Sequence, residues 1–224
     1  MNGVAEASRP WYRFTDRGDG DLAPDSFGVE GRRLEVVPLP WTWLRQQHGA
    51  EVVVVEGPGD HAGDAGDAAV TAVPGVALAV QTADCAPVVL IGATDAGRSA
   101  VGVVHAGWRG LTAGIVPAAV DAMRRLGVAG FRAVVGPCIH AGCYPFGDAD
   151  LDLVAGLLGE GVRARAPDGR PTLDLVAGVR AALADAKVDA CADVGICTVC
   201  SGRHWSHRGG GDGERQALVA SLLR

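Results

Sequence analysis

Residues 81–110 read QTADCAPVVLIGATDAGRSAVGVVHAGWRG, and the other segments of the chain are best understood in relation to this stretch. It holds two apolar runs, 87–93 and 99–104, which are separated by the turn-like residues 94–98. Short β-rich runs on either side of a glycine-containing loop are typical of an antiparallel hairpin. The stretch therefore predicts two neighbouring strands in the middle of the chain.

The pairing of these two predicted strands places a thiol beside an imidazole. If Ala93 faces Ser99, the antiparallel register brings Pro87 opposite His105. Cys85 comes just before the first strand, so it lies at the same end of the hairpin as His105. We expect the chemistry of the protein at this end, because Cys and His serve as nucleophiles, bases and metal ligands.

Composition and charge exclude several classes of protein. The chain has 224 residues, a formal net charge of -6 and no basic run, which argues against nucleic acid as a partner. No apolar run approaches the ~20 residues of a membrane span, and the first residues lack the apolar core of a signal peptide. Six cysteines are too few for a disulfide scaffold at this length, which favours a reducing cytoplasm. The sequence leaves the oligomeric state open.

Apolar patterning predicts strands and helices at uneven spacing along the chain. Strands are expected at 32–37, 52–55, 76–80, 134–135 and 194–197, helices at 115–126, 149–158 and 173–186, and 216–223 fits either. Residues 57–69, rich in Gly and Asp, are typical of a solvated loop. With no repeat, linker or low-complexity segment, the sequence predicts one α+β domain over residues 1–224 rather than a regular βαβ series.

Three residues at the ends of predicted strands or turns form a candidate metal site. His48, Cys85 and His105 offer two imidazoles and a thiolate, a set that suits zinc with one open position and that could also hold copper. By spacing alone, a buried cysteine and two hydrogen-bonded histidines are the commoner arrangement. Cys85 and His105 are also a candidate nucleophile–base pair, with Asp84 or Gln46 as the orienting group. Metal content decides between these alternatives.

Arginines offer a candidate anion site near the same place. Arg109 follows Trp108 where a helix is expected to begin, and helix-start amides with a guanidinium form an anion pocket. Arg203, Arg208 and Arg215 lie in a Gly-rich tail. This tail could close over the same pocket, or it could be a solvated charged loop.

The remaining cysteines carry a weaker signal. Cys197 and Cys200 form a single CxxC, while Cys138 and Cys143 flank His140 in GPCIHAGCY. One CxxC without a second pair only weakly indicates a zinc ribbon, and ordinary packed thiols are the commoner explanation. A second metal site around His140 is an alternative to simple packing.

At TADCAPV, HAGWRG and GPCI…CY the chain resembles the YfiH-type proteins, also called laccase-domain or polyphenol oxidoreductase proteins. QQHGAEVV, GDAAVTAVPGVALAVQTADC and CTVC…HWSHR add to the resemblance, which is close over residues 41–145 and looser elsewhere. It implies a layered αββα arrangement with mixed β-sheets, related to cysteine-hydrolase-like toxins with an equivalent Cys–His pair. It also implies that His48, Cys85 and His105 bind one zinc ion.

The resemblance implies activities of several classes. The leading hypothesis is a zinc-dependent purine nucleoside enzyme, which performs phosphorolysis of adenosine, inosine or methylthioadenosine, deamination of adenosine, or both. One alternative is a hydrolase or amidase that edits peptidoglycan precursors through zinc-activated water or through Cys85 and His105. Copper-dependent phenol oxidation ranks low, because the six histidines form no His-x-His pair. A non-catalytic metal-binding protein is the last alternative.

The leading hypothesis assigns roles to the polar residues around the predicted metal site. Zinc would activate water for attack on the purine C6, and Asp84 would act as acid or base unless it only caps its turn. Arg109 and Arg208 would hold phosphate, with Gln46 and Arg215 as further substrate contacts. The ends of the chain, TDRGDGDLAPDSFG and SHRGGGDGERQ, depart from the family pattern, so the resemblance does not fix the substrate.

Overall fold

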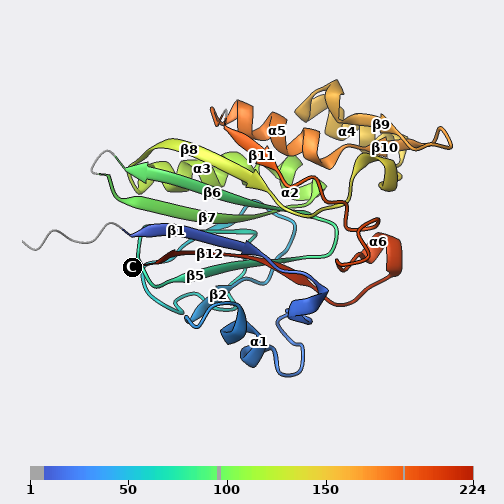
Figure 1. The fold of residues 1–224 in the computed structure, drawn as a ribbon. Coiled ribbons are helices and arrows are strands. Elements are labelled where there is room, and N and C mark those ends of the chain that lie inside the picture. The colour runs from blue at the N-terminus through green and yellow to red at the C-terminus, as the bar shows by residue number, and fades with distance from the viewer. Residues whose placement is uncertain (1–7, 95–96, 189, 224) are drawn as a thin grey trace, which may run out of the picture.

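A computed structural model describes residues 8–94, 97–188 and 190–223 as four layers in the order helices, sheet, sheet, helix (Figure 1). Helices α3 (Ile115–Arg125) and α5 (Leu175–Asp185) cover the larger sheet, and α1 (Val29–Val36) lies beneath the smaller one. The two sheets face each other between these helices. This is the layered αββα arrangement with mixed sheets that the resemblance to the YfiH-type proteins implies, and it fits the α+β class that the patterning predicts.

The larger sheet has six strands in the order β11-β8-β6-β7-β4-β3. Its central strands are antiparallel, whereas β11 runs parallel to β8 and β3 runs parallel to β4. The strands are β3 (Val52–Val54), β4 (Ala68–Thr71), β6 (Ala86–Thr94), β7 (Ser99–Ala106), β8 (Val128–Val135) and β11 (Cys191–Asp193).

The smaller sheet has four strands in the order β1-β12-β5-β2, of which only β2 runs parallel to its neighbour. The strands are β1 (Arg9–Phe14), β2 (Trp41–Trp43), β5 (Ala77–Thr82) and β12 (Gln216–Leu223). A separate ribbon pairs β9 (Arg163–Arg165) with β10 (Pro171–Leu173).

The other helical segments lie outside the two sheets. The α-helices are α2 (Trp108–Ala113), α4 (Asp148–Leu158) and α6 (His207–Gly210), and the 3-10 helices are η1 (Arg17–Asp19), η2 (Ala141–Cys143) and η3 (Glu160–Val162). Among the described residues, no helix combines the length and apolarity that crossing a bilayer requires.

The layers arise because side chains alternate strictly between the two faces of each strand, and both faces are buried. On β6, Val88 and Leu90 pack toward the helices, whereas Val89 and Ile91 pack between the two sheets. On β12, Leu218, Ala220 and Leu222 face the space between the sheets, while Ala217 and Val219 face the α1 side. Because successive side chains of a strand point to opposite faces, a continuous apolar run provides two packing surfaces at once.

The central hairpin has the predicted register. Ala93 pairs with Ser99 and Pro87 pairs with His105 across β6 and β7. The predicted connection includes residues 95–96, which lie outside the described residues. Cys85 and His105 therefore meet at one end of the hairpin, as predicted.

Two predicted strands are wrong. Residues 32–37 fall largely in α1, because Val29, Arg33 and Val36 lie on one buried helical face. The apolar stem of Arg33 is buried there, with its guanidinium over the Trp41 and Trp43 rings. The strand expected at 194–197 lies instead at Cys191–Asp193, where it pairs with β8. The alternatives at 216–223 resolve as strand β12.

Candidate metal site and substrate pocket

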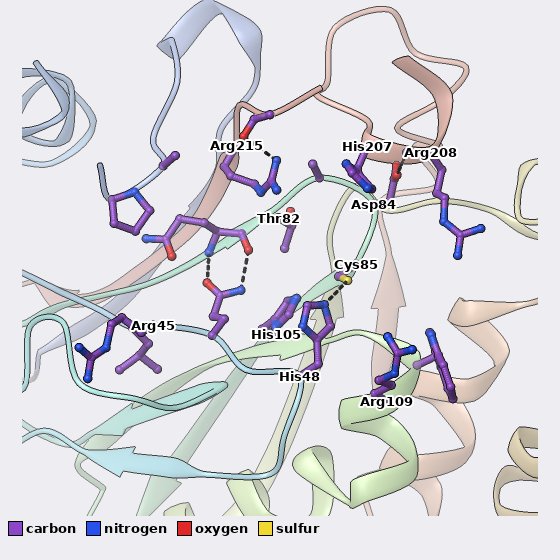
Figure 2. Close-up of a pocket in the computed structure, with 18 of the residues that line it drawn as sticks. Arg45, His48, Thr82, Asp84, Cys85, His105, Arg109, His207, Arg208 and Arg215 are labelled. Atoms are coloured by element: carbon purple, nitrogen blue, oxygen red, sulfur yellow. Dashed lines mark hydrogen bonds between the residues drawn. The ribbon is translucent and has the colours of Figure 1, made fainter. Parts of the chain in front are cut away.

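The three predicted ligands converge from three separate segments. His48 lies between β2 and β3, Cys85 in the turn between β5 and β6, and His105 near the end of β7. Their donor atoms all lie within 4.8 Å of one another, and Cys85 Sγ is 3.7 Å from His48 Nε2. Figure 2 shows the three side chains pointing toward one another. The structure therefore brings the predicted set together.

Asp67 holds the ring of His105 and the backbone of the segment that carries His48. Its Oδ1 accepts hydrogen bonds from His105 Nδ1 at 2.8 Å and from the His48 backbone N–H at 2.9 Å. Its Oδ2 accepts from the backbone N–H groups of Gln47 and Gly49. Because Nδ1 of His105 is engaged, Nε2 is the ring nitrogen left for a metal or for Cys85.

Sequence reasoning missed Asp67, because it falls in the segment 57–69 that is typical of a solvated loop. In the structure this residue is buried and directly precedes β4. Its position just before the apolar run 68–70 is the signal that could have identified it. A carboxylate at the start of a strand that is buried on both faces is poorly placed to remain in solvent.

The cluster perturbs the protonation of its own members. Burial raises the pKa of Cys85, but the charge and hydrogen bond of His105 outweigh burial and, with His48, lower the pKa to about 6. Burial lowers the pKa of His105, whereas the neighbouring Cys85 and Asp67 raise it to about 9. Without a metal, Cys85 and His105 therefore form a thiolate–imidazolium pair at neutral pH.

The donor set and its spacing fit a zinc ion. Tetrahedral zinc with ordinary Zn–S and Zn–N bonds holds a sulfur and a nitrogen ligand about 3.6 Å apart, and the Cys85–His48 separation is 3.7 Å. Gly107 keeps the space around these ligands clear. A Cβ at Gly107 would lie 2.9 Å from Cys85 Sγ and 2.9 Å from His48 Cδ2.

A cavity of about 720 Å³ opens over the three ligands and is rich in arginine. Arg109 and Arg208 lie on one side of Cys85 in Figure 2, with Arg45 and Arg215 on the other. Within the ranges that the structure describes, neither Arg109 nor Arg208 has a carboxylate within 4.0 Å. Their guanidinium groups are therefore available to an anionic ligand.

An aromatic cluster supports these two arginines. The Arg109 guanidinium lies over the Trp108 ring at 4.5 Å, and that of Arg208 lies over the Tyr144 ring at 5.0 Å. Phe146 packs edge-on against both rings, at centroid distances of 5.4 and 5.3 Å. Cation–π contacts thus hold both guanidinium groups beside the cavity.

Asp84 joins the pocket floor to the C-terminal loop. Its Oδ1 accepts from the hydroxyls of Thr198 and Ser206, and its Oδ2 accepts from the Arg208 backbone N–H at 2.7 Å. The residue is buried and has a left-handed backbone with φ of 98°. The geometry makes Asp84 an anchor for the α6 segment that carries Arg208.

The other predicted contact residues have internal partners. Gln46 lines the cavity, yet its amide exchanges two hydrogen bonds of 2.7 Å with the Gln81 backbone. Arg215 also lines the cavity, with Nη1 donating to the carbonyls of Asp212, Gly213 and Glu214. Arg203 instead pairs with Asp16.

This fold, with a His2Cys cluster at one end of its central hairpin, is that of the YfiH-type proteins. The Neisseria meningitidis protein NMB0706, assigned to DUF152, has a TM-score of 0.82 and 28% identity, over 96% of this chain and 95% of that one. The hypothetical protein YfiH of Bacillus licheniformis has a TM-score of 0.80 and 26% identity, over 95% of this chain and 92% of that one.

Residues 30–222 match the family described as multi-copper polyphenol oxidoreductase laccase, and the chain belongs to this family. A Streptomyces griseus protein named purine nucleoside phosphorylase ORF3 is 41% identical, over 79% of this chain and 72% of that protein. A Streptomyces coelicolor protein named purine nucleoside phosphorylase SCO2081 is 39% identical, over 84% of this chain and 74% of that protein.

Proposed function

We propose that this protein is a zinc-dependent purine nucleoside enzyme whose main reaction is phosphorolysis of adenosine, inosine or methylthioadenosine. The observation that carries the proposal is one cavity that joins the His48–Cys85–His105 cluster to Arg109 and Arg208, which have no carboxylate within 4.0 Å in the described part of the chain. The names of the Streptomyces relatives support the same class of reaction. A volume of about 720 Å³ is ample for a nucleoside and a phosphate.

Arg109 and Arg208 are the proposed phosphate ligands. A guanidinium donates paired hydrogen bonds to phosphate oxygens and neutralises part of their charge. Both groups are held against aromatic rings on the same side of Cys85, so little conformational freedom is lost when phosphate binds. Arg215 and Gln46 line the opposite wall, where the Gln46 amide is engaged by the Gln81 backbone and Nη1 of Arg215 by backbone carbonyls, so both side chains are held in place beside the nucleoside.

The proposed reaction transfers the ribosyl group from the base to phosphate. A phosphate oxygen attacks the ribose C1, the bond from C1 to the purine nitrogen breaks, and the departing base takes up a proton. His48, Cys85 and His105 would hold a zinc ion, which supplies a Lewis acid at the pocket floor when bound. The chain's arginines would hold the phosphate in line with C1. The two bound substrates then react in a fixed relative orientation and need not meet by diffusion.

Asp84 is proposed as a positioning residue in this reaction. The positioning role rests on the three hydrogen bonds that the Asp84 carboxylate accepts from Thr198, Ser206 and Arg208, and the acid–base role predicted from sequence stays a prediction. Deamination of adenosine in the same pocket stays a further prediction. It consumes water instead of phosphate, so the requirement for phosphate separates the two reactions.

The thiolate–imidazolium pair supports a second candidate, hydrolysis of a peptidoglycan precursor. Cys85, with a pKa lowered to about 6, could attack an amide carbonyl while His105 protonates the departing amine, and water would then cleave the resulting thioester and release the acid. Because a thiolate bound to zinc is a poor nucleophile, this route requires the metal-free protein, whereas hydrolysis by zinc-activated water would require the metal. We do not propose multicopper oxidation, because six histidines without a His-x-His pair cannot supply its copper ligands.

A product assay tests the leading proposal. Zinc-loaded protein is incubated with adenosine, inosine or methylthioadenosine, with and without phosphate, and free base is separated by chromatography. We expect base release only with phosphate, and a loss of about tenfold to a hundredfold in kcat/KM for Arg109→Ala. Arg125→Ala, a change on the exposed side of α3, is the matched control and should leave the rate unchanged. The proposal is contradicted if no base is released, or if base is released at the same rate with and without phosphate.

A further inference from the structure

A second group of sulfur atoms gathers outside the His48–Cys85–His105 cluster. The Sγ atoms of Cys143, Cys197 and Cys200 all lie within 4.8 Å of one another, and those of Cys143 and Cys200 are 3.3 Å apart. Cys143 and Cys197 are half-buried and Cys200 is exposed, so these thiols meet at the surface and not in the apolar core. Simple packing does not explain why three thiols converge there.

The CxxC turn is held in place by backbone contacts. The Ser201 backbone N–H donates to the Cys197 carbonyl at 3.0 Å, and an isolated parallel bridge pairs Cys197 with Cys138. Backbone hydrogen bonds between Cys138 and the flanking residues Ile196 and Thr198 fix the turn against the segment that leads to Cys143.

We propose that Cys143, Cys197 and Cys200 bind a second zinc ion, with a solvent molecule as the fourth ligand. Thiolates are soft ligands that select zinc among the common divalent ions, and tetrahedral zinc holds pairs of sulfurs about 3.8 Å apart. The sulfurs need to move only slightly from their positions to reach that spacing. A disulfide would require an S–S distance of about 2.0 Å, and all three cysteines are free.

The position of this site gives it a structural task. Cys143 precedes Tyr144, whose ring supports Arg208, and Cys197 precedes Thr198, whose hydroxyl donates to Asp84. Segments 141–146 and 197–208 are thus two parts of one pocket wall that are far apart in the sequence. A shared zinc ion would link them directly, and it would do so whatever substrate the pocket takes.

Zinc binding to a variant that lacks the first site tests this inference without any activity assay. In Cys85→Ala, kept reduced and titrated with zinc, we expect one equivalent of tightly bound metal per chain. Cys85→Ala combined with Cys200→Ser should bind none. Cobalt(II) bound to Cys85→Ala should give a sulfur-to-metal charge-transfer band, and this band should be absent when Cys200→Ser is added. Cys85→Ala combined with Cys191→Ser is the matched control and should keep both signals, because Cys191 lies in β11 outside the trio.

Hydrogen exchange and thiol mapping complete the test. Zinc should slow amide exchange in segments 141–146 and 197–208 of Cys85→Ala but not in the Cys200→Ser double variant. Retention of zinc at the first site in Cys200→Ser alone shows that this substitution leaves the fold intact. If reduced Cys85→Ala binds no zinc, the inference is wrong. A Cys143–Cys200 disulfide that persists under reducing conditions overturns it as well. Either result would leave the proposed phosphorolysis untouched.

Discussion

The carboxylate of Asp67 lies 2.8 Å from Nδ1 of His105, and the two side chains are 1% and 4% exposed. The same oxygen atom of Asp67 accepts the backbone N–H of His48. One buried carboxylate therefore orients the ring of His105 and fixes the backbone position of His48, two of the three proposed zinc ligands. Burial raises the pKa of Asp67, but the hydrogen bond from His105 and those from the backbone lower it below its ordinary value, so Asp67 stays ionised.

Asp67→Asn should weaken zinc binding. The substitution keeps the size of the side chain but removes the charge that holds His105 in one tautomer, and loss of such a partner typically costs about tenfold to a hundredfold in metal affinity. Competition with a chromophoric chelator measures the affinity. Asp64→Asn is the matched control, because Asp64 makes the same 2.8 Å contact to His61 on the surface. Equal zinc affinity in the wild type and Asp67→Asn would show that this carboxylate does not support the site.

Gly107→Ala should disrupt the ligands by sterics alone. The new methyl group would lie 2.9 Å from both Cys85 Sγ and His48 Cδ2, so at least one ligand must move. We expect zinc affinity to fall on the order of tenfold or more, measured by the same competition. Gly156→Ala in α4 is the control, since a Cβ there meets nothing within 4 Å. Unchanged affinity in Gly107→Ala would place the metal elsewhere.

The metal-free protein should show an unusually acidic thiol. The pKa of Cys85 is lowered to about 6, so its alkylation rate should stay high at neutral pH and fall as the pH drops through about 6. Burial raises the pKa of Cys191, so its rate should still be rising well above neutral pH and serves as an internal reference. Peptide mass spectrometry follows each cysteine separately.

Two further changes check the cause of the low pKa. His105→Gln removes the positive neighbour, so the midpoint for Cys85 should move upward, because burial then dominates. Added zinc should protect Cys85 from alkylation at every pH at which it binds. A Cys85 midpoint near that of an ordinary thiol in the wild type would contradict the described electrostatics.

Asp84→Asn separates a positioning role from an acid–base role. Asn is tolerated in the left-handed backbone region but replaces one accepting oxygen by an NH2 donor, so at least one of the three hydrogen bonds to the loop is lost. If Asp84 positions Arg208, KM for phosphate should rise by about tenfold with a smaller change in kcat. A loss confined to kcat, together with the disappearance of one limb of the pH profile, would instead identify an acid or base.

Sequence reasoning succeeded where local pattern and packing agree. The register of β6 and β7 could be predicted because a short loop joins two β-rich runs, which leaves few ways to pair Pro87 with His105. Helix α3 follows its 3.6-residue apolar period, with Pro117 accommodated in the first turn. The meeting of Cys85 and His105 follows directly from the hairpin.

The features that sequence reasoning missed depend on contacts between distant segments. A strand is expected at 32–37 because no local pattern indicates that Arg33 is buried against two tryptophans on the inner face of α1. Strand β1 has no alternating pattern of its own and exists because it pairs with β12 at the other end of the chain. Cys143 meets Cys197 and Cys200 through tertiary structure, and no spacing rule links them. Asp67 looks like a loop residue until the two histidines are placed around it.

Phosphorus NMR of the reaction mixture tests the central claim most directly, namely that zinc held by His48, Cys85 and His105 serves phosphate-dependent cleavage of a purine nucleoside. Zinc-loaded protein, the same protein after chelation, and chelated protein with zinc restored are each incubated with inosine and phosphate. The proposal predicts a ribose 1-phosphate signal in the first and third samples, strong loss in the second, and none with His48→Ala. A signal of equal strength in the chelated sample, or no ribose 1-phosphate in any sample, would contradict it.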